Sequence, residues 1–285
     1  MRSILISKSG SFADAMGLLE EIFGVLKPII GMVHLRPLPG TPGSTNLEDV
    51  LAYALRDAES LVEGGVDGLL VENFFDSPFY PEKVPPHIIS SMTLIAWEIK
   101  KRYDLPIGIN VLRNDSEASL AIASAIGGKF IRVGVHIGCV VTDQGLIQGR
   151  AHQTIRYRKL LGSDVKIFAD VEVKHGYTLY RVPLAQASRD TYYRGRADAL
   201  IITGPETGVE ASVDDLRAVK EALPDVPLLV GSGVNPDNVE AMLRYADGAI
   251  VGTYFKRDGV VSNPVDPTRV KKLMEVVREV RRVQR

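Results

Sequence analysis

The sequence predicts a (β/α)₈ barrel, and three regularities carry that prediction. Eight short apolar runs follow one another along the chain, and each is succeeded by a stretch with helical periodicity. Each run is continuously apolar rather than alternating, which is typical of strands buried on both faces of a parallel sheet. Eight strand–helix units in about 250 residues match the size of such a barrel. The alternative, a doubly wound open sheet, rarely contains eight such even units.

The elements can be assigned in order along the chain. Strands are predicted at residues 28–34, 67–73, 106–112, 129–135, 165–173, 198–204, 227–233 and 247–253. Helices are predicted near residues 48–63, 87–103, 115–126, 151–161, 184–195, 212–222, 236–244 and 267–283. Residues 12–26 predict a short amphipathic helix that covers one end of the barrel, within an N-terminal extension over residues 1–27. We expect residues 1–285 to form a single domain, because no boundary interrupts this pattern.

Two long loops break the regular spacing. Residues 74–86 follow the second strand and contain four prolines. Residues 136–151 follow the fourth strand and hold two β-prone pieces around Gln144-Gly145, which predicts a small β-hairpin. Both loops leave the C-terminal ends of strands, where barrels build their sites, and long loops there are often lids.

Composition and charge exclude several classes of function. A net charge of −1 gives no global attraction to nucleic acid, so we expect no nucleic-acid partner. No segment approaches the ~18–20 consecutive apolar residues of a transmembrane helix, and the N-terminus does not resemble a secretory signal. The single cysteine, Cys139, precludes an intramolecular disulfide. It suits a reducing compartment, and we expect a cytoplasmic protein.

The last predicted helix carries an apolar stripe, with Arg278, Arg281, Arg282 and Arg285 gathered toward its end. Cations favour a helix C-terminus, and a packed helix needs a polar face, which is the simpler interpretation. The alternative is a basic patch for peripheral contact with an anionic membrane.

The turns after the last two predicted strands favour a phosphate site. The seventh strand ends in Gly231, Ser232 and Gly233 before a predicted helix start, and the eighth ends in Gly252 and Thr253. Backbone N–H groups and hydroxyls at this position bind phosphate in barrels of this kind, although a turn that needs only glycine torsions is the alternative. Thr203 and Gly204, after the sixth strand, add a further candidate donor.

Polar side chains also end the other predicted strands. They are His34, Glu72, Asn73, Asn110, Arg132 and Asp170, followed by Glu172, Lys174 and His175. Burying such groups costs several kcal/mol unless each is paired, so their collection at one rim favours proton-transfer chemistry. In that chemistry a carboxylate or imidazole acts as base, and Lys or Arg stabilises an enolate-like oxyanion.

Structural alternatives exist for each of these groups. Glu72 and Arg132 could form an ion pair across strands, and Lys174 and His175 could be loop surface. A divalent metal could be held by His34, Glu72, Asp170 and His175, although no tight ligand spacing supports it. Lys174 is less favoured as a Schiff-base former, since it follows the apolar run rather than lying within it.

Several stretches together resemble the BtpA/SgcQ family over nearly the whole chain from about residue 28. They are GMVHLRPLPGTPG (31–43), VENFFDSPF (71–79), GINVLRND (108–115), FIRVGVHIGCVVTDQGLIQGRA (130–151), DVEVKHG (170–176), VGSGVNPDNV (230–239) and DGAIVGTYFKRDGVVSNPVD (247–266). The resemblance implies a fold similar to ribulose-phosphate-binding barrels and places His34, Glu72, Asn73, Asn110, Arg132 and Asp170 within family motifs. The chain departs from these motifs at Phe75, where the family tends to have glycine.

Two functions follow as expectations. The first is an enzyme on a small phosphorylated metabolite, a sugar or nucleoside phosphate, of isomerase, lyase or aldol type. The second, implied by the resemblance, is a non-enzymatic assembly or stabilising factor, a role connected with photosystem I in photosynthetic relatives, with peripheral membrane association. Barrels of this kind often form homo-oligomers, and we expect one here.

Overall fold

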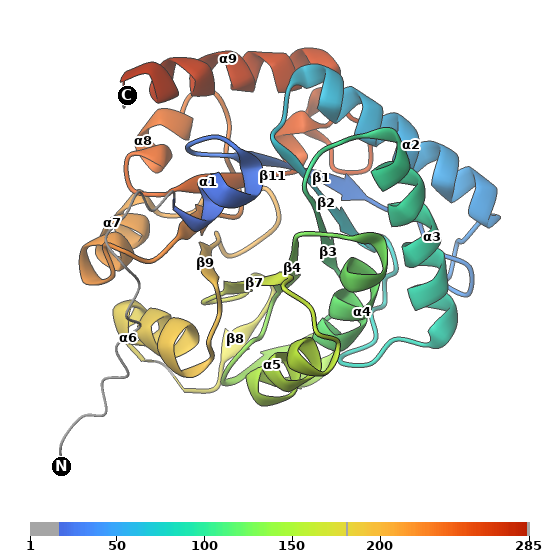
Figure 1. The fold of residues 1–285 in the computed structure, drawn as a ribbon, viewed down its shortest axis with the longest axis horizontal. Helices are drawn as coiled ribbons and strands as arrows, with labels where there is room; N and C mark the ends of the chain where they lie inside the picture. The colour runs from blue at the N-terminus through green and yellow to red at the C-terminus, as the bar shows by residue number, and fades with distance from the viewer. Residues whose placement is uncertain (1–16, 181, 284–285) are drawn as a thin grey trace.

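The computed structural model describes residues 17–180 and 182–283, which form a closed barrel of eight parallel strands with helices around it (Figure 1). This confirms the predicted fold class. The strands are β1 (Ile29–His34), β2 (Gly68–Glu72), β3 (Ile107–Asn110), β4 (Phe130–Val133), β7 (Lys166–Asp170), β9 (Ala199–Ile202), β10 (Leu228–Val230) and β11 (Gly248–Val251). Strand β1 pairs with both β2 and β11, which closes the sheet.

The helices between the strands fall close to their predicted positions. They are α2 (Leu47–Gly64), α3 (Pro86–Arg102), α4 (Ser116–Ile126), α5 (Ala151–Leu160), α6 (Leu184–Arg189), α7 (Val213–Ala222), α8 (Val239–Leu243) and α9 (Pro267–Val283). Helix α6 continues as a π-helical segment, η1 (Asp190–Arg194). Helix α8 starts later than predicted, because the Asn235 side chain accepts the N–H groups of Asp237 and Asn238 and holds a turn there.

Local sequence signals set several helix ends. Asn46, Asp115 and Ser212 each accept a backbone N–H three residues on, which caps α2, α4 and α7. Gly65 and Gly127 end α2 and α4 in the left-handed conformation that glycine adopts without steric cost.

Two apolar layers hold the barrel together. The larger packs the outer side of the strands against the helices. The smaller fills the barrel interior, where Phe130 and Phe168 stack with ring centroids 4.7 Å apart. Helix α1 (Leu18–Phe23) covers the opening at the N-terminal ends of the strands, and Phe23 meets Phe130 edge-on at 5.7 Å (Figure 1). The predicted N-terminal helix is thus present over these residues, while residues 12–16 lie outside the described chain. In the part of the chain that the structure describes, the barrel is therefore open to a ligand only at the C-terminal ends of its strands.

The hairpin predicted after the fourth strand is also present. It consists of β5 (Cys139–Thr142) and β6 (Gly145–Gln148), with Thr142 opposite Gly145, so its turn is at Asp143-Gln144, one residue earlier than predicted. A short strand, β8 (Tyr177–Thr178), pairs with β5 and joins the loop after β7 to the hairpin. Two residues are too few for periodicity to indicate a strand, which explains why the sequence did not reveal β8.

Two of the arginines of α9 already form ion pairs with acidic residues of the chain. Arg281 forms an ion pair with Asp67 and donates to the Lys27 carbonyl at 3.0 Å, and Arg282 pairs with Glu279 at 2.7 Å. Arg285 lies outside the described residues. Within the described chain, no helix has both the length and the apolar character needed to cross a membrane.

A buried ion pair connects the loop after β11 to helix α2. Lys256 follows the 3₁₀ helix η2 (Thr253–Phe255), and its Nζ lies 2.5 Å from Oδ2 of Asp57 on α2. Both side chains are 1% exposed, and Asp57 Oδ1 also accepts the Val265 N–H at 2.8 Å. Since each charge would be costly to bury alone, the pair must stay complete for the fold to tolerate it.

We predict that Lys256→Met lowers the free energy of unfolding by about 3–5 kcal/mol, because it leaves Asp57 buried and unpaired. Urea denaturation measures the change. The matched control is Lys101→Met, which removes an exposed lysine paired with Glu98 and should cost under about 1 kcal/mol. Similar losses in the two variants would contradict this account of the Lys256–Asp57 pair.

Candidate functional site

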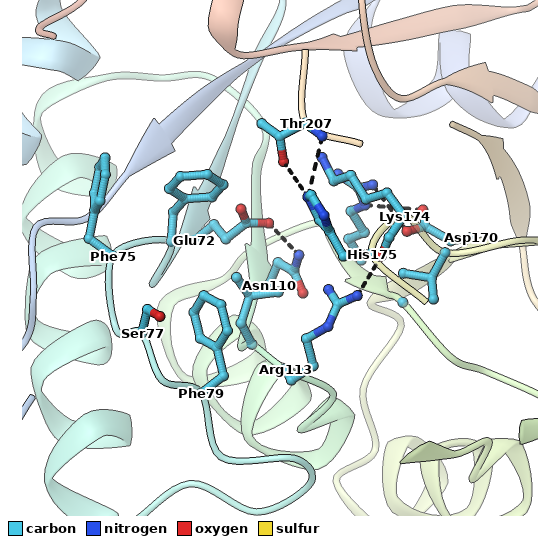
Figure 2. Close-up of a pocket in the computed structure, with 15 residues that line it drawn as sticks. Glu72, Phe75, Ser77, Phe79, Asn110, Arg113, Asp170, Lys174, His175 and Thr207 are labelled. Atoms are coloured by element: carbon cyan, nitrogen blue, oxygen red, sulfur yellow. Dashed lines mark hydrogen bonds and ion pairs between the residues drawn. The ribbon is translucent and has the colours of Figure 1, made fainter. Parts of the chain in front are cut away.

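A cavity of about 300 Å³ opens at the C-terminal ends of the strands. Figure 2 shows its side chains converging from several strands and from the loops after β2, β3 and β7. It is lined by Glu72, Phe74, Phe75, Ser77, Phe79, Asn110, Leu112, Arg113, Arg132, Gly134, Asp170, Val173, Lys174, His175 and Thr207. Of the seven residues predicted to do acid–base chemistry, only His34 is not among them.

Arg132 and Asp170 form a two-point ion pair between the neighbouring strands β4 and β7. Arg132 Nε donates to Oδ1 at 3.1 Å and Nη2 donates to Oδ2 at 3.0 Å, and each residue is 4% exposed. Burial opposes the charge on Arg132, but Asp170 and Glu72 outweigh it and raise the pKa of the guanidinium. Asp170 therefore positions a permanent cation, and both of its oxygens are engaged in doing so.

Glu72 has a different setting, although it lies near the same cation. Its Oε2 accepts from Asn110 Nδ2 at 2.5 Å, and its Oε1 lies 3.9 Å from His34 Nε2. These three residues end the adjacent strands β1, β2 and β3. Arg132 pairs with Asp170 rather than with Glu72, so the Glu72 carboxylate is the less constrained of the two.

His34 is buried and uncharged at neutral pH. Burial lowers its pKa well below 6.5, and the nearby cations Lys256, Lys174 and Arg132 lower it further. Its ring stacks on Phe74 with centroids 4.3 Å apart. Nδ1 has no hydrogen-bond partner among the described residues. A neutral imidazole has one donor and one acceptor nitrogen, so His34 can donate one hydrogen bond and accept another without carrying charge.

Lys174 connects the main cavity with a second, smaller one, since it lines both. Its side chain is half-buried, and its carbonyl accepts from Arg113 Nη2 at 2.5 Å, which fixes the backbone. Burial, with a contribution from Arg132, lowers the pKa of the amine from 10.5 to about 8. The amine is therefore mainly protonated at pH 7 but can release its proton in a mildly alkaline range.

His175, the next residue, is exposed and has a positive φ of 57°. Its Nε2 lies 3.0 Å from Thr207 Oγ1 and accepts the Thr207 N–H at 3.3 Å. The ring therefore contacts the loop after β9 as well as the cavity, and burial lowers its pKa.

The smaller cavity, of about 30 Å³, lies where the phosphate site was predicted. Its lining includes Gly231, Ser232 and Gly233 after β10, Gly252 and Thr253 after β11, and the cations Arg132 and Lys174. Among the residues that the structure describes, none accepts the backbone N–H of Ser232 or Gly233. Since α8 begins only at Val239, these donors belong to a loop rather than to a helix N-terminus.

The glycines of this cavity leave little room for a side chain. Gly233 has φ of 71°, and a Cβ there would lie 2.2 Å from the Glu210 Cα. A Cβ on Gly252 would lie 3.0 Å from His34 Cε1. Their presence keeps backbone amides and the imidazole accessible to a small ligand.

The other two predicted phosphate-site residues lie beside this cavity rather than in it. The Gly204 N–H donates to Ser232 Oγ at 2.6 Å, and Thr203 Oγ1 donates to the Glu172 carbonyl at 3.1 Å. Both line a neighbouring surface cavity. Thr207 and Gly208, further along the same loop, take the place next to Thr253. Residues 203–208 read TGPETG, so both ends of this loop offer a Thr-Gly pair. Nothing in the sequence distinguished the two ends, because the path of the loop decides which one turns inward.

Asn73, which the family motif includes, supports the loop after β2 instead of lining either cavity. Its Oδ1 accepts the Leu112 N–H at 2.7 Å, and its Nδ2 donates to Asp76 Oδ2 at 3.0 Å. Asp76 Oδ1 accepts the Leu38 N–H at 2.8 Å, and burial raises the pKa of Asp76. Three loops are thus fastened together beside the cavity.

The arrangement does not reproduce the metal site considered from the sequence. Over residues 17–180 and 182–283, no group of three or more His, Cys, Asp or Glu side chains comes together as a metal site would require. Of the four proposed ligands, Asp170 is paired with Arg132, and His175 turns toward Thr207. The four side chains considered as ligands are therefore not gathered into a metal site among the described residues.

Charge at the rim favours an anionic ligand. Three cations, Arg113, Arg132 and Lys174, line the main cavity with two carboxylates, Glu72 and Asp170, which leaves a surplus of one positive charge. Arg113 was missed by the sequence reasoning, although it follows the third strand in the motif GINVLRND, where its position alone could have indicated it.

A sequence model of the BtpA family matches residues 25–279. The chain is 45% identical over 262 residues to the photosystem I biogenesis protein BtpA of Synechocystis sp., covering 92% of this chain and 91% of that protein. It is 35% identical over 271 residues to the putative sgc region protein SgcQ of Escherichia coli, covering 94% and 100%.

Solved structures share the fold at low sequence identity. Thiamine phosphate pyrophosphorylase from Pyrococcus furiosus matches with a TM-score of 0.56 and 14% identity, over 90% of this chain and 96% of that one. Orotidine 5′-phosphate decarboxylase from Pyrococcus horikoshii matches with a TM-score of 0.54 and 15% identity, over 88% and 99%.

We predict that one lysine titrates near pH 8, because burial and Arg132 disfavour the charged form of Lys174. Nuclear magnetic resonance of reductively ¹³C-methylated protein follows each lysine separately. The resonance with the low midpoint should vanish in Lys174→Arg. A Lys174 midpoint near the ordinary value of 10.5 would show that the amine is solvated and would contradict the lowered pKa.

Proposed function

The chain belongs to the BtpA family, and from the geometry of its site we propose that it is an enzyme acting on a small phosphorylated metabolite. The observation that carries the proposal is the junction of two cavities. A small cavity with free amides and an acid–base cavity share Arg132, Lys174 and Thr207. A phosphate in the first would hold the rest of the substrate against the groups of the second.

The proposed phosphate site combines directed donors with charge. The N–H groups of Ser232 and Gly233 and the Thr253 hydroxyl supply hydrogen bonds, and Arg132 and Lys174 supply the opposing charge. A phosphate bound there would direct the rest of the substrate into the main cavity, which Glu72 lines.

The reaction class that fits best is proton transfer next to a carbonyl, as in isomerases, lyases and aldol-type enzymes. Glu72, held by Asn110, is placed to accept a proton, since neither of its oxygens is paired with a cation. Lys174 and Arg132 would stabilise the enolate oxyanion that forms. His34, being neutral, would pass a proton between Glu72 and the substrate without adding charge.

The second candidate function rests on the 45% identity to a relative named for photosystem I biogenesis. A factor that works through its surface would not need amides and cations left open at the rim. Of the basic residues that such a surface would use, Arg281 is already paired with Asp67. We therefore favour the enzyme, and phosphate binding separates the two functions.

We predict that inorganic phosphate binds and raises the melting temperature, since a ligand of the folded state stabilises it by mass action. Gly233→Ala should weaken binding about tenfold or more, because its Cβ displaces the loop whose amides bind the ion. Isothermal titration calorimetry gives the dissociation constants.

Gly127→Ala is the matched control, because Gly127 has a similar φ of 69°, no neighbour within 4 Å of its Cβ and no place in the site. It should lose stability but keep phosphate affinity. Thr253→Val tests the same site without backbone strain. Phosphate affinity unchanged in both site variants would contradict the proposed phosphate site.

We predict that Glu72→Gln lowers kcat by about 10²–10⁴ on whichever phosphorylated substrate is turned over, with little change in binding, because the amide keeps the shape but not the basicity. Steady-state kinetics and direct substrate titration are the measurements. Glu172→Gln, at an exposed carboxylate outside the main cavity, is the control. A Glu72→Gln variant with full kcat would exclude Glu72 as the base.

A further inference from the structure

The main cavity has one aromatic wall that proton transfer on a phosphorylated sugar would not use. Phe74, Phe75 and Phe79 from the loop after β2 line it, together with the apolar side chains of Leu112 and Val173. Figure 2 shows Phe75 and Phe79 on the side of the cavity opposite to Lys174 and Asp170. The three rings are only partly buried, so apolar surface faces the cavity.

The wall is held in place. The Phe74 ring stacks on His34, and Phe75 meets Phe74 edge-on with centroids 5.0 Å apart. The chain beyond them is fastened by the Arg113 N–H, which donates to the Tyr80 carbonyl at 3.0 Å. A preformed aromatic surface binds a flat ring without the entropic cost of ordering several side chains.

The aromatic wall on one side and the charged groups on the other limit which ligands the cavity can hold. A sugar phosphate alone would place hydroxyls against phenyl rings, which offer them no hydrogen bond and remove their water. A planar ring in the same place would release water from the phenylalanines and gain stacking contacts. In Figure 2, Glu72 and Asn110 lie between Phe75 on one side and Lys174, which also lines the smaller cavity, on the other. Their carboxylate and amide groups suit sugar hydroxyls.

We propose that the substrate carries three parts in this order: a phosphate, a sugar with free hydroxyls, and a planar aromatic ring that stacks on the wall of Phe74, Phe75 and Phe79. The chemical class is that of a sugar phosphate linked to an aromatic ring, and nucleoside 5′-monophosphates serve as its binding probes. This inference rests on the proposed function, because it places the phosphate in the cavity of Ser232 and Gly233.

The test compares three kinds of probe by isothermal titration calorimetry: inorganic phosphate, ribose 5-phosphate and the common ribonucleoside 5′-monophosphates. At least one nucleotide should bind about tenfold or more tightly than ribose 5-phosphate, since stacking on an aromatic side chain is worth about this much. Phe79→Ala should remove most of that advantage and leave ribose 5-phosphate affinity unchanged. Phe79→Leu, which keeps apolar bulk but no ring, should fall between.

Trp97→Ala is the control, because Trp97 is an exposed aromatic on α3 that lines neither cavity. It should leave every affinity unchanged. If ribose 5-phosphate binds as tightly as all the nucleotides, or if Phe79→Ala does not change the ratio, the aromatic-ring inference is overturned while the phosphorylated-metabolite proposal stands. If neither phosphate nor any phosphorylated probe binds, both are overturned.

Discussion

Closure of the sheet is the constraint on which the rest of this molecule depends. Because β1 pairs with both β2 and β11, the C-terminal ends of all eight strands meet at one rim. Helix α1 and Phe23 cover the other end, so the interior stays apolar up to the level at which Glu72, Arg132 and Asp170 end their strands. These charges are buried only because they lie at the single open end, where a ligand or water can also reach them.

The pairing at this rim assigns different tasks to chemically similar groups. Asp170 and Glu72 are both buried carboxylates near Arg132, yet Asp170 uses both oxygens on the guanidinium and Glu72 uses neither. Arg132 is thereby held between the two cavities with its charge fixed. Burial, and after it the neighbouring charge of Arg132, lowers the pKa of Lys174 to about 8. Asp170 thus occupies the guanidinium and leaves Glu72 without a cation paired to either oxygen.

The sequence was informative about the elements and less so about their loops. Continuous apolar runs and helical periodicity located strands and helices within a few residues, because those signals are local. The strand ends also located the rim residues, since parallel strands bring their C-terminal ends together. Which partner each polar group takes was beyond the sequence: Arg132 could have paired with Glu72 as well as with Asp170. The inward turn of Thr207 rather than Thr203, and the strand β8, likewise depend on contacts between segments far apart in the chain.

In the loop after β2, the residues that hold the loop in place differ from those that face the cavity. Asn73 and Asp76 face the loops after β1 and β3 and fasten the segment through backbone hydrogen bonds, while Phe74, Phe75 and Phe79 in the same segment face the cavity. Because the fastening uses none of the phenyl rings, the aromatic wall can vary without loosening the loop. The smaller cavity has no such freedom, since a side chain at Gly233 would collide with the Glu210 backbone. We infer that the anion site is the fixed part of this architecture and that the wall opposite it sets which substrate is accepted.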